Sequence, residues 1–171
     1  MNTTLAAAMA ALLISGCAGY QARPAATARL LPTQGNAVTG NVTFIKTVNY
    51  VLVSGEVQGL APNTEHGFHI HEKGDCSSAD AMSAGGHFNP RGGQHGAIEQ
   101  AEHHAGDLQS LKSDANGVAR FSFMASALSV GEGAADVIGR GLIVHRDPDD
   151  FKTQPTGNSG PRLACAVIAG S

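Results

Sequence analysis

The chain has 171 residues, of which 42% are hydrophobic and 15% are charged. This length fits one domain of about 100–200 residues, and the low charge, against roughly 25% in an average protein, excludes a disordered polyelectrolyte and a long charged coiled coil. The formal net charge of −3 offers no basic surface, so we expect no nucleic-acid partner.

The first 17 residues are typical of a targeting segment. Residues 5–14 form an apolar run that suits a secretory signal and is too short to span a bilayer, for which a helix needs about 20 residues. Ile14-Ser15-Gly16-Cys17 follows this run and resembles the lipobox of bacterial lipoproteins, whose cysteine is acylated and becomes the mature N-terminus. The residues before the run carry no basic side chain, although secretory signals usually have one there. An ordinary signal peptide cleaved elsewhere, with Cys17 discarded, is the alternative.

The chain after Cys17 predicts a tether followed by an exported domain. Residues 18–25 are rich in alanine and contain a proline, which is typical of a linker. We therefore assign residues 1–17 to a lipoprotein signal, 18–25 to a tether and 26–171 to one folded domain. Because Ala18 resembles outer-membrane sorting, we expect a periplasmic protein that contacts the outer membrane of a bacterium only through a lipid on Cys17.

The cysteine count agrees with export to an oxidising compartment. Acylation of Cys17 leaves Cys76 and Cys165 as an even pair. We expect these two to form a disulfide, and closing a loop of about 90 residues stabilises a fold by about 4–5 kcal/mol in the chain-entropy model. Two free buried thiols are the alternative.

Short β-branched or alternating stretches recur after residue 26, and no window of helical period competes with them. Turn signals such as Pro62-Asn63, Gly74-Asp75 and Asn116-Gly117 separate them, and Asn116-Gly117 is typical of a hairpin. This spacing predicts an antiparallel sandwich or barrel. The expected strands are residues 29–31, 41–46, 50–58, 67–71, 118–123 and 142–145.

Two long stretches, residues 73–102 and 147–160, interrupt the strand pattern and are rich in Gly, Pro, Asp, Asn and Ser. Loops longer than about 12–15 residues inside a compact domain are usually functional or disordered. The first stretch carries Cys76, His87 and His95, so we expect an ordered functional loop.

Histidine is unusually frequent, with 8 residues, and neutral imidazole is the commonest metal-ligand side chain. His69 and His71 lie two positions apart on an expected strand, so their rings project from the same face. One histidine alone is more often a packing or surface residue than a ligand, but the set together predicts a metal site. The further candidates are His87, His95, His104, Asp107 and His145.

This nitrogen-rich set with one carboxylate suits zinc and copper, whereas an oxygen-only set would suit magnesium or calcium. Seven candidate ligands are too many for one tetrahedral ion. We therefore expect two ions.

The domain carries six motifs in a fixed order. They are GFHIHE at 67–72, GDC at 74–76, GHFNP at 86–90, HG at 95–96, HAGDL at 104–108 and GNSGPRLAC at 157–165. With these motifs, residues 26–171 resemble the bacterial, periplasmic copper/zinc superoxide dismutases over their whole length. The resemblance implies an all-β Greek-key sandwich, a flattened eight-stranded barrel with two long metal-binding loops.

The resemblance also implies one copper and one zinc per subunit. His87 would bridge the two ions as an imidazolate, and Asp149 would hydrogen-bond one copper histidine and one zinc histidine, with Asp150 as the alternative one position later. His66 and His103 match no ligand position. The implied copper ligands are His69, His71, His87 and His145, and the implied zinc ligands are His87, His95, His104 and Asp107.

The implied activity is disproportionation of superoxide to O2 and H2O2 by alternate reduction and oxidation of the copper. Arg162 would place a fixed positive charge beside the copper, His87 would take up a proton on copper reduction, and Thr156 would narrow the channel. Lys73 and Lys152 are weaker candidates for steering the anion. The subunit state stays open between monomer and homodimer.

Two other functions fit parts of the pattern. A copper or zinc buffer that keeps the sandwich would be expected to have lost a copper ligand, and none is lost. A zinc hydrolase would need three protein ligands and an open position on the zinc, whereas four ligands are assigned to it.

Overall fold

The computed structural model describes residues 25–171. The expected signal over residues 1–17, with Cys17, and all but the last residue of the expected tether lie outside the described residues. Ten strands and one short 3-10 helix make up the regular structure of the described part. They are β1 (Ala26–Pro32), β2 (Thr39–Lys46), β3 (Val51–Gln58), β4 (Glu65–His66), β5 (Phe68–His71), η1 (Met82–Ala84), β6 (Leu111–Lys112), β7 (Ala119–Ala125), β8 (Gly141–His145), β9 (Arg162–Val167) and β10 (Ala169–Gly170).

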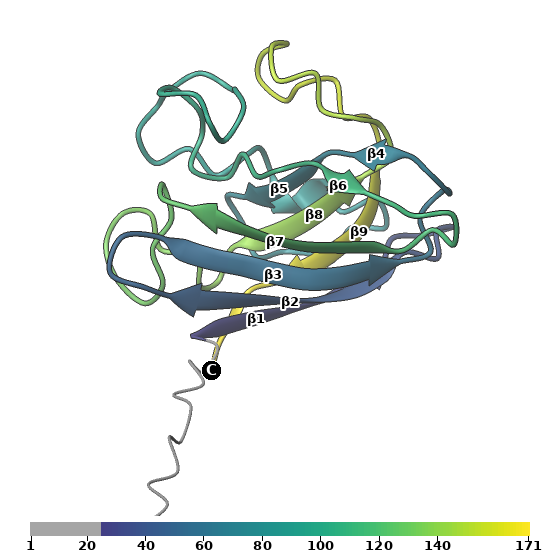
Figure 1. Cartoon of the computed structure of the whole chain (residues 1–171), viewed down its shortest axis with the longest axis horizontal. Coiled ribbons are helices and arrows are strands. Elements are labelled where there is room, and N and C mark those ends of the chain that lie inside the picture. The colour runs from purple at the N-terminus through teal and green to yellow at the C-terminus, as the bar shows by residue number, and fades with distance from the viewer. Residues whose placement is uncertain (1–24) are drawn as a thin grey trace, which may run out of the picture.

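Eight strands form one antiparallel sheet in the order β5-β8-β9-β1-β2-β3-β7, with β10 beside β1. A separate two-stranded sheet pairs β4 with β6. The large sheet curls so that β5 and β8 lie behind β7 and β3 in Figure 1. The order is not sequential, since β9 lies between β8 and β1. This confirms the expected all-β fold, in which the eight-stranded sheet curls into a half-barrel, called the barrel below.

The barrel core is built from the alternate residues of each strand that point inward. Phe44 of β2 and both Phe68 and Ile70 of β5 are fully buried in one cluster. Burying a side chain of this size contributes about 1.5–3 kcal/mol. His69 and His71 alternate with Phe68 and Ile70, so the packing of β5 against the core fixes where both histidines point.

The six expected strands are confirmed with shifted ends, but the sequence pattern does not predict β4, β6, β9 or β10. Three of these have only two residues, and β9 is rich in small side chains. The Asn116-Gly117 turn is present, with Gly117 donating to the carbonyl of Asp114 at 3.0 Å. It joins β6 to β7, which pair with β4 and β3 rather than with each other.

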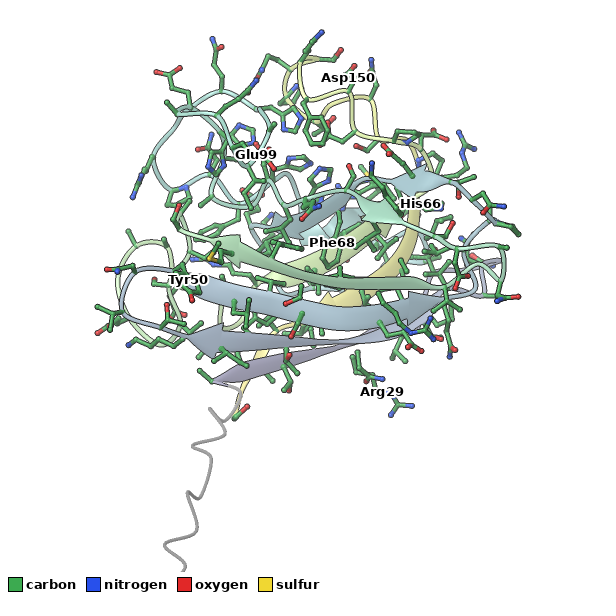
Figure 2. The ribbon with its side chains drawn as sticks, viewed as in Figure 1. Arg29, Tyr50, His66, Phe68, Glu99 and Asp150 are labelled. Atoms are coloured by element: carbon green, nitrogen blue, oxygen red, sulfur yellow. A yellow bond between two sulfur atoms is a disulfide. The ribbon has the colours of Figure 1, made fainter. Side chains whose placement is uncertain are left out.

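The two long loops extend from the same end of the barrel (Figure 1). Figure 2 shows Glu99 on the first loop and Asp150 on the second at this end, while Arg29 lies on the far side of the sheet. Within residues 25–171, no helix has the length and apolar character needed to cross a bilayer.

Candidate metal centre

The first histidines of the centre come from β5 and β8, which pair antiparallel. His69 and His71 are fully buried and His145, at the end of β8, is 4% exposed. The β8–β9 register shifts between Val144 and His145, and such an irregularity re-aims a side chain. It brings the Nε2 atom of His145 to 3.4 Å from the Nε2 atom of His71.

The segment between β5 and β6, which contains the first long loop, crosses β5 and adds further histidines. Ile70 of β5 donates to the carbonyl of Gly106 at 2.9 Å, and Phe88 donates to the carbonyl of Ile70 at 2.8 Å. A Cβ at position 106 would overlap the carbonyl of Ile70, so this close approach requires glycine. The contacts hold His87, next to Phe88, and Asp107, next to Gly106, against the strand.

Two groups of buried ligand atoms result, each with its atoms within 4.8 Å of one another. We name them the four-histidine group and the aspartate-containing group. Every sequence-predicted ligand falls into the group expected for it, and His87 belongs to both. The four-histidine group is His69, His71, His87 and His145, and the aspartate-containing group is His87, His95, His104 and Asp107.

The aspartate-containing group is centred on the Oδ1 atom of Asp107. This oxygen lies 2.8 Å from Nδ1 of His87, 3.0 Å from Nδ1 of His95 and 3.3 Å from Nδ1 of His104. The Oδ2 atom accepts backbone N–H groups of Gly96 at 3.0 Å and His104 at 2.8 Å. Asp107 is therefore fixed with one oxygen free to face the three rings.

Buried ring nitrogens without a hydrogen-bond partner indicate whether the two groups could bind metal ions. Among residues 25–171, four buried histidine nitrogens have no hydrogen-bond partner, and leaving a buried polar atom unpaired costs about 1–3 kcal/mol. All of them face one of the two groups, where a metal ion would satisfy them. They are Nδ1 of His69, Nε2 of His87, Nδ1 of His95 and Nδ1 of His104. The donor sets fit copper and zinc.

In His71 and His145, the ring nitrogen that points away from the four-histidine group makes a hydrogen bond, and this bond fixes the orientation of the ring. Nδ1 of His71 donates to the carbonyl of Gly85 at 2.9 Å, and Nδ1 of His145 donates to the carbonyl of Gly160 at 3.1 Å. Because a carbonyl only accepts, each ring carries its proton on Nδ1 and turns the lone pair of Nε2 toward the four-histidine group. Sequence reasoning missed the roles of Gly85 and Gly160, because backbone carbonyls leave no sequence signal.

Burial and neighbouring charge set the protonation of the groups. Burial, followed by repulsion from neighbouring rings, lowers the pKa of His71 and His145 well below the usual value and lowers the pKa of His87 to about 4. Burial also acts to lower the pKa of His95, but its close contacts with the carboxylates of Asp107 and Asp149 outweigh it and raise this pKa to about 9. Burial acts to raise the pKa of Asp107, but the ring nitrogens of three histidines close to its carboxylate hold this pKa far below its usual range. The four-histidine group thus contains neutral rings, the form that binds metal.

Asp149 connects the two groups from the second loop. Its Oδ2 atom accepts from Nε2 of His69 at 2.6 Å and its Oδ1 atom accepts from Nε2 of His95 at 2.9 Å. A Cβ at Gly157 would overlap the Asp149 carboxylate, and this glycine has φ of 64°, so the second loop closes over Asp149 only with glycine there. The alternative residue, Asp150, is exposed and accepts from Lys152 and Thr153 of its own loop.

A cavity of about 670 Å³ leads from the surface to the four-histidine group. His71 and His145 line its inner part, and Thr156 and Arg162 also line it. Arg162 donates from Nη1 to the carbonyl of Ala81 and from Nη2 to the carbonyl of Gly85, both at 2.6 Å. The guanidinium is therefore held in one orientation. Among the described residues that line this cavity, neither Lys73 nor Lys152 occurs.

The expected disulfide is confirmed: Cys76 and Cys165 are bonded, with a Cα–Cα distance of 5.8 Å. Cys165 lies on β9, three residues after Arg162. Cys76 lies in the first loop, before the carbonyls that hold the guanidinium. The disulfide therefore links the strand that carries Arg162 to the loop whose carbonyl groups, at Ala81 and Gly85, accept the hydrogen bonds of Arg162.

The two histidines that match no ligand position lie apart from both groups. His66 is 2% exposed, and its ring joins the carbonyl of His145 at 2.9 Å to the hydroxyl of Thr64 at 2.8 Å. His103 is half-buried, and its Nδ1 atom donates to the carbonyl of His104. Both are packing residues that support the chain beside a candidate ligand.

Comparison with known proteins identifies the family. The family model described as copper/zinc superoxide dismutase matches residues 38–168. The chain is 38% identical to the copper/zinc superoxide dismutase 2 of Aquifex aeolicus over 161 residues, which cover 92% of each protein. It is 38% identical to an extracellular copper/zinc superoxide dismutase of Caenorhabditis elegans over 149 residues, covering 84% of this chain and 65% of that protein.

A solved structure shares the fold. The crystal structure of the clock protein EA4 matches with a TM-score of 0.78 and 36% identity, covering 90% of this chain and 98% of that one. The match of the family model to most of the domain and the similarity to the Aquifex protein along nearly the whole chain lead to one conclusion. The chain belongs to the copper/zinc superoxide dismutase family.

Proposed function

We propose that the protein disproportionates superoxide into O2 and H2O2, with copper in the four-histidine group and zinc in the aspartate-containing group. Copper bound there supplies the redox chemistry, because alternation between Cu(II) and Cu(I) oxidises one superoxide to O2 and, with two protons, reduces a second to H2O2. The observation that carries the proposal is His87, whose two ring nitrogens face different groups. In this arrangement one ring could offer a donor nitrogen to each of the two groups.

The ligand atoms follow from the free ring positions. Nδ1 of His69 and Nε2 of His87 are unpaired within the described part of the chain, and Nε2 of His71 and His145 are turned to the same space. These four nitrogens would hold copper. The zinc ligands would be Nδ1 of His87, His95 and His104 and one oxygen of Asp107.

The aspartate-containing group would hold zinc as a structural ion. Zinc does not change oxidation state in proteins, and four protein ligands give the closed tetrahedral shell of a structural site. Asp107 orients the Nδ1 side of His87, so the zinc group would set the position of this ring in the other group. A zinc hydrolase is disfavoured because such a shell leaves no position for water.

His87 is the proposed proton carrier of the site. Its Nε2 atom is unpaired and faces the four-histidine group, where it would hold a proton and release it toward the product. Its Nδ1 atom stays beside the Oδ1 atom of Asp107, at 2.8 Å, in the aspartate-containing group. The side chain of His87 is only 1% exposed, so we expect protons to reach it from the cavity that its group partners His71 and His145 line, rather than across the core.

Arg162 is proposed to bind and orient the anionic substrate. Its guanidinium stays charged at any physiological pH, and it lies in the wall of the cavity that ends at His71 and His145. Local charge in a cavity acts on an approaching ion more strongly than the net charge of the protein. Thr156 lines the same cavity and would limit its width, so that a small anion passes.

The cavity also favours an enzyme over a protein that only stores metal ions. A buffer gains from complete enclosure of its ion, whereas here an open route with a fixed cation leads to His71 and His145. The test is superoxide decay followed by pulse radiolysis with the copper- and zinc-loaded protein. We expect rapid decay, loss of catalysis after copper removal and recovery when copper is restored. Decay that does not depend on copper would overturn the proposal.

The proposed location is the periplasm, with a lipid on Cys17 that anchors the protein to the outer membrane. The Cys76–Cys165 disulfide supports export, because disulfides persist in oxidising compartments. Similarity to an extracellular family member supports the same view. The intact mass of protein extracted from membranes tests the anchor. We expect an acylated chain that begins at Cys17, and an unmodified soluble chain would contradict it.

A further inference from the structure

The mouth of the cavity carries two side chains that superoxide chemistry does not use. Asp80 and Met82 both line it, together with His71 and His145. Met82 is 60% exposed, so its thioether is accessible from solvent. A carboxylate at the mouth opposes an approaching anion, so Asp80 works against the capture of superoxide.

The fold fixes the side chains of Asp80 and Met82 relative to the guanidinium of Arg162. Ala81 and Ala84 are buried in a small cluster with Ile143, which leaves Met82 pointing outward from η1. The Oδ1 atom of Asp80 accepts the backbone N–H of Met82 at 3.0 Å. Between them, the carbonyl of Ala81 holds Arg162. The two side chains thus stand on either side of the residue that positions the guanidinium.

The chemistry of this pair matches a monovalent copper ion. A thioether is a soft ligand that favours Cu(I), and a carboxylate attracts a cation. The cavity that begins at Asp80 and Met82 continues to His71 and His145, whose Nε2 atoms lie 3.4 Å apart and end the route. A copper ion that enters by this cavity therefore meets the thioether and the carboxylate before the imidazoles.

We infer that Asp80 and Met82 form a copper-loading rim, which first binds Cu(I) and passes it to His71 and His145. The inference rests on the proposed function, because it supplies copper to the four-histidine group. It explains why a carboxylate stands at the mouth of a cavity for an anion. It also gives a role to the only methionine in the described lining of the cavity, whose sulfur would be the first soft ligand on the route.

Met124 provides a matched control. It is 63% exposed, and it lies on β7 away from the residues that line the cavity. Leucine is similar in size to methionine and lacks the sulfur, so Met82→Leu and Met124→Leu make the same chemical change at nearly equal exposure. A difference between these variants therefore reports the position of the sulfur rather than its exposure.

The experiment measures uptake of Cu(I) by zinc-loaded, copper-free protein without oxygen. Cu(I) is supplied as its coloured bicinchoninate complex, and the loss of colour follows transfer to the protein. We expect Met82→Leu to slow uptake about tenfold, which corresponds to about 1.4 kcal/mol of activation free energy. Met124→Leu should load at the wild-type rate, and all three proteins should reach one copper per chain.

Asp80→Asn separates charge from structure, since the amide oxygen still accepts the N–H of Met82. We expect slower Cu(I) uptake and faster reaction with superoxide in the loaded enzyme, because removal of one negative charge affects a cation and an anion in opposite directions. Added salt should reduce both differences.

Three outcomes would overturn the inference. Met82→Leu could load as fast as the wild type, both methionine variants could slow alike, or Asp80→Asn could change both rates in the same direction. A wild-type protein that takes up no copper would overturn the proposed function together with this inference. Normal uptake by every variant would overturn the inference alone.

Discussion

Asp149 and His69 are hydrogen-bonded at 2.6 Å, although they lie 80 residues apart in the chain. The same carboxylate accepts from His95 at 2.9 Å, so one side chain orients a ring of each metal group. Burial acts to raise the pKa of Asp149, but hydrogen bonds from these two histidines hold it well below its usual range. Both oxygens are therefore acceptors, and the metal groups are coupled through one carboxylate.

Asp149→Asn should weaken metal binding. An amide offers one acceptor and one donor, so one of the two histidine N–H groups would face an N–H instead of an oxygen. Loss of such an orienting partner typically costs about 10–100-fold in metal affinity. Competition with a zinc chelator measures the effect. The control is Asp150→Asn, which changes an exposed carboxylate of the same loop and should bind zinc like the wild type. Equal affinities for both variants would contradict the role of Asp149.

Arg162→Glu should slow superoxide turnover by about 10–1000-fold, the range over which electrostatic steering acts, while copper and zinc contents stay at the wild-type level. The reason is the reversal of charge inside the cavity wall. Pulse radiolysis gives the rate and metal analysis gives the contents. Arg29→Glu makes the same change in net charge on the far side of the sheet (Figure 2) and should leave the rate nearly unchanged. If both variants were equally slow, net charge rather than position would explain the rate.

Replacement of Cys76 and Cys165 together by serine should destabilise the domain by about 2–5 kcal/mol, the usual cost of removing a native disulfide from a small secreted domain. Urea unfolding of the metal-free protein measures this loss. A reducing agent should lower the stability of the wild type toward that of the variant and should not affect the variant. An unchanged midpoint in the double variant would show that the bond does not support the fold.

His66→Leu should destabilise the domain because it leaves the buried carbonyl of His145 without its donor. An unpaired buried group of this kind costs about 1–3 kcal/mol. Thermal unfolding of the loaded protein reports the change. His103→Leu is the comparison, since this ring is half-buried and should change stability by less than about 0.5 kcal/mol. A stable His66→Leu protein would mean that the ring fills space without supporting His145.

The sequence predicts those strands whose alternation places large apolar residues in the core. In β2 and β5 the period of two is visible, and Phe44, Phe68 and Ile70 are buried as this pattern requires. Strand β9 carries alanine and cysteine instead, so no local signal marks it. It is a strand because β8 and β1 pair with its two sides.

Some ligands of the candidate site can be predicted from local sequence, and others cannot. The clamp formed by His69 and His71 follows from strand geometry alone. The loop ligands do not, because long-range contacts such as the hydrogen bond from the backbone N–H of His95 to the Gln154 side chain at 2.8 Å set the loop path. Family resemblance provided the assignment of those ligands to two groups.

The sequence does not show which of the two neighbouring aspartates, Asp149 or Asp150, contacts the histidines. Asp149 and Asp150 have the same side chain in the same loop, and only the fold distinguishes them. Asp149 is 6% exposed under the glycine turn at Gly157, whereas Asp150 is exposed to solvent. Close approach of backbone to a carboxylate depends on three-dimensional packing and leaves no pattern in the chain.

X-ray diffraction from crystals of the loaded protein, recorded at the copper and zinc absorption edges, tests the central claim most directly. The account predicts two separate peaks for each chain, copper bonded to Nε2 of His87 and zinc bonded to Nδ1 of the same ring. A single shared metal peak, or two ions of which either lacks a bond to His87, would contradict it.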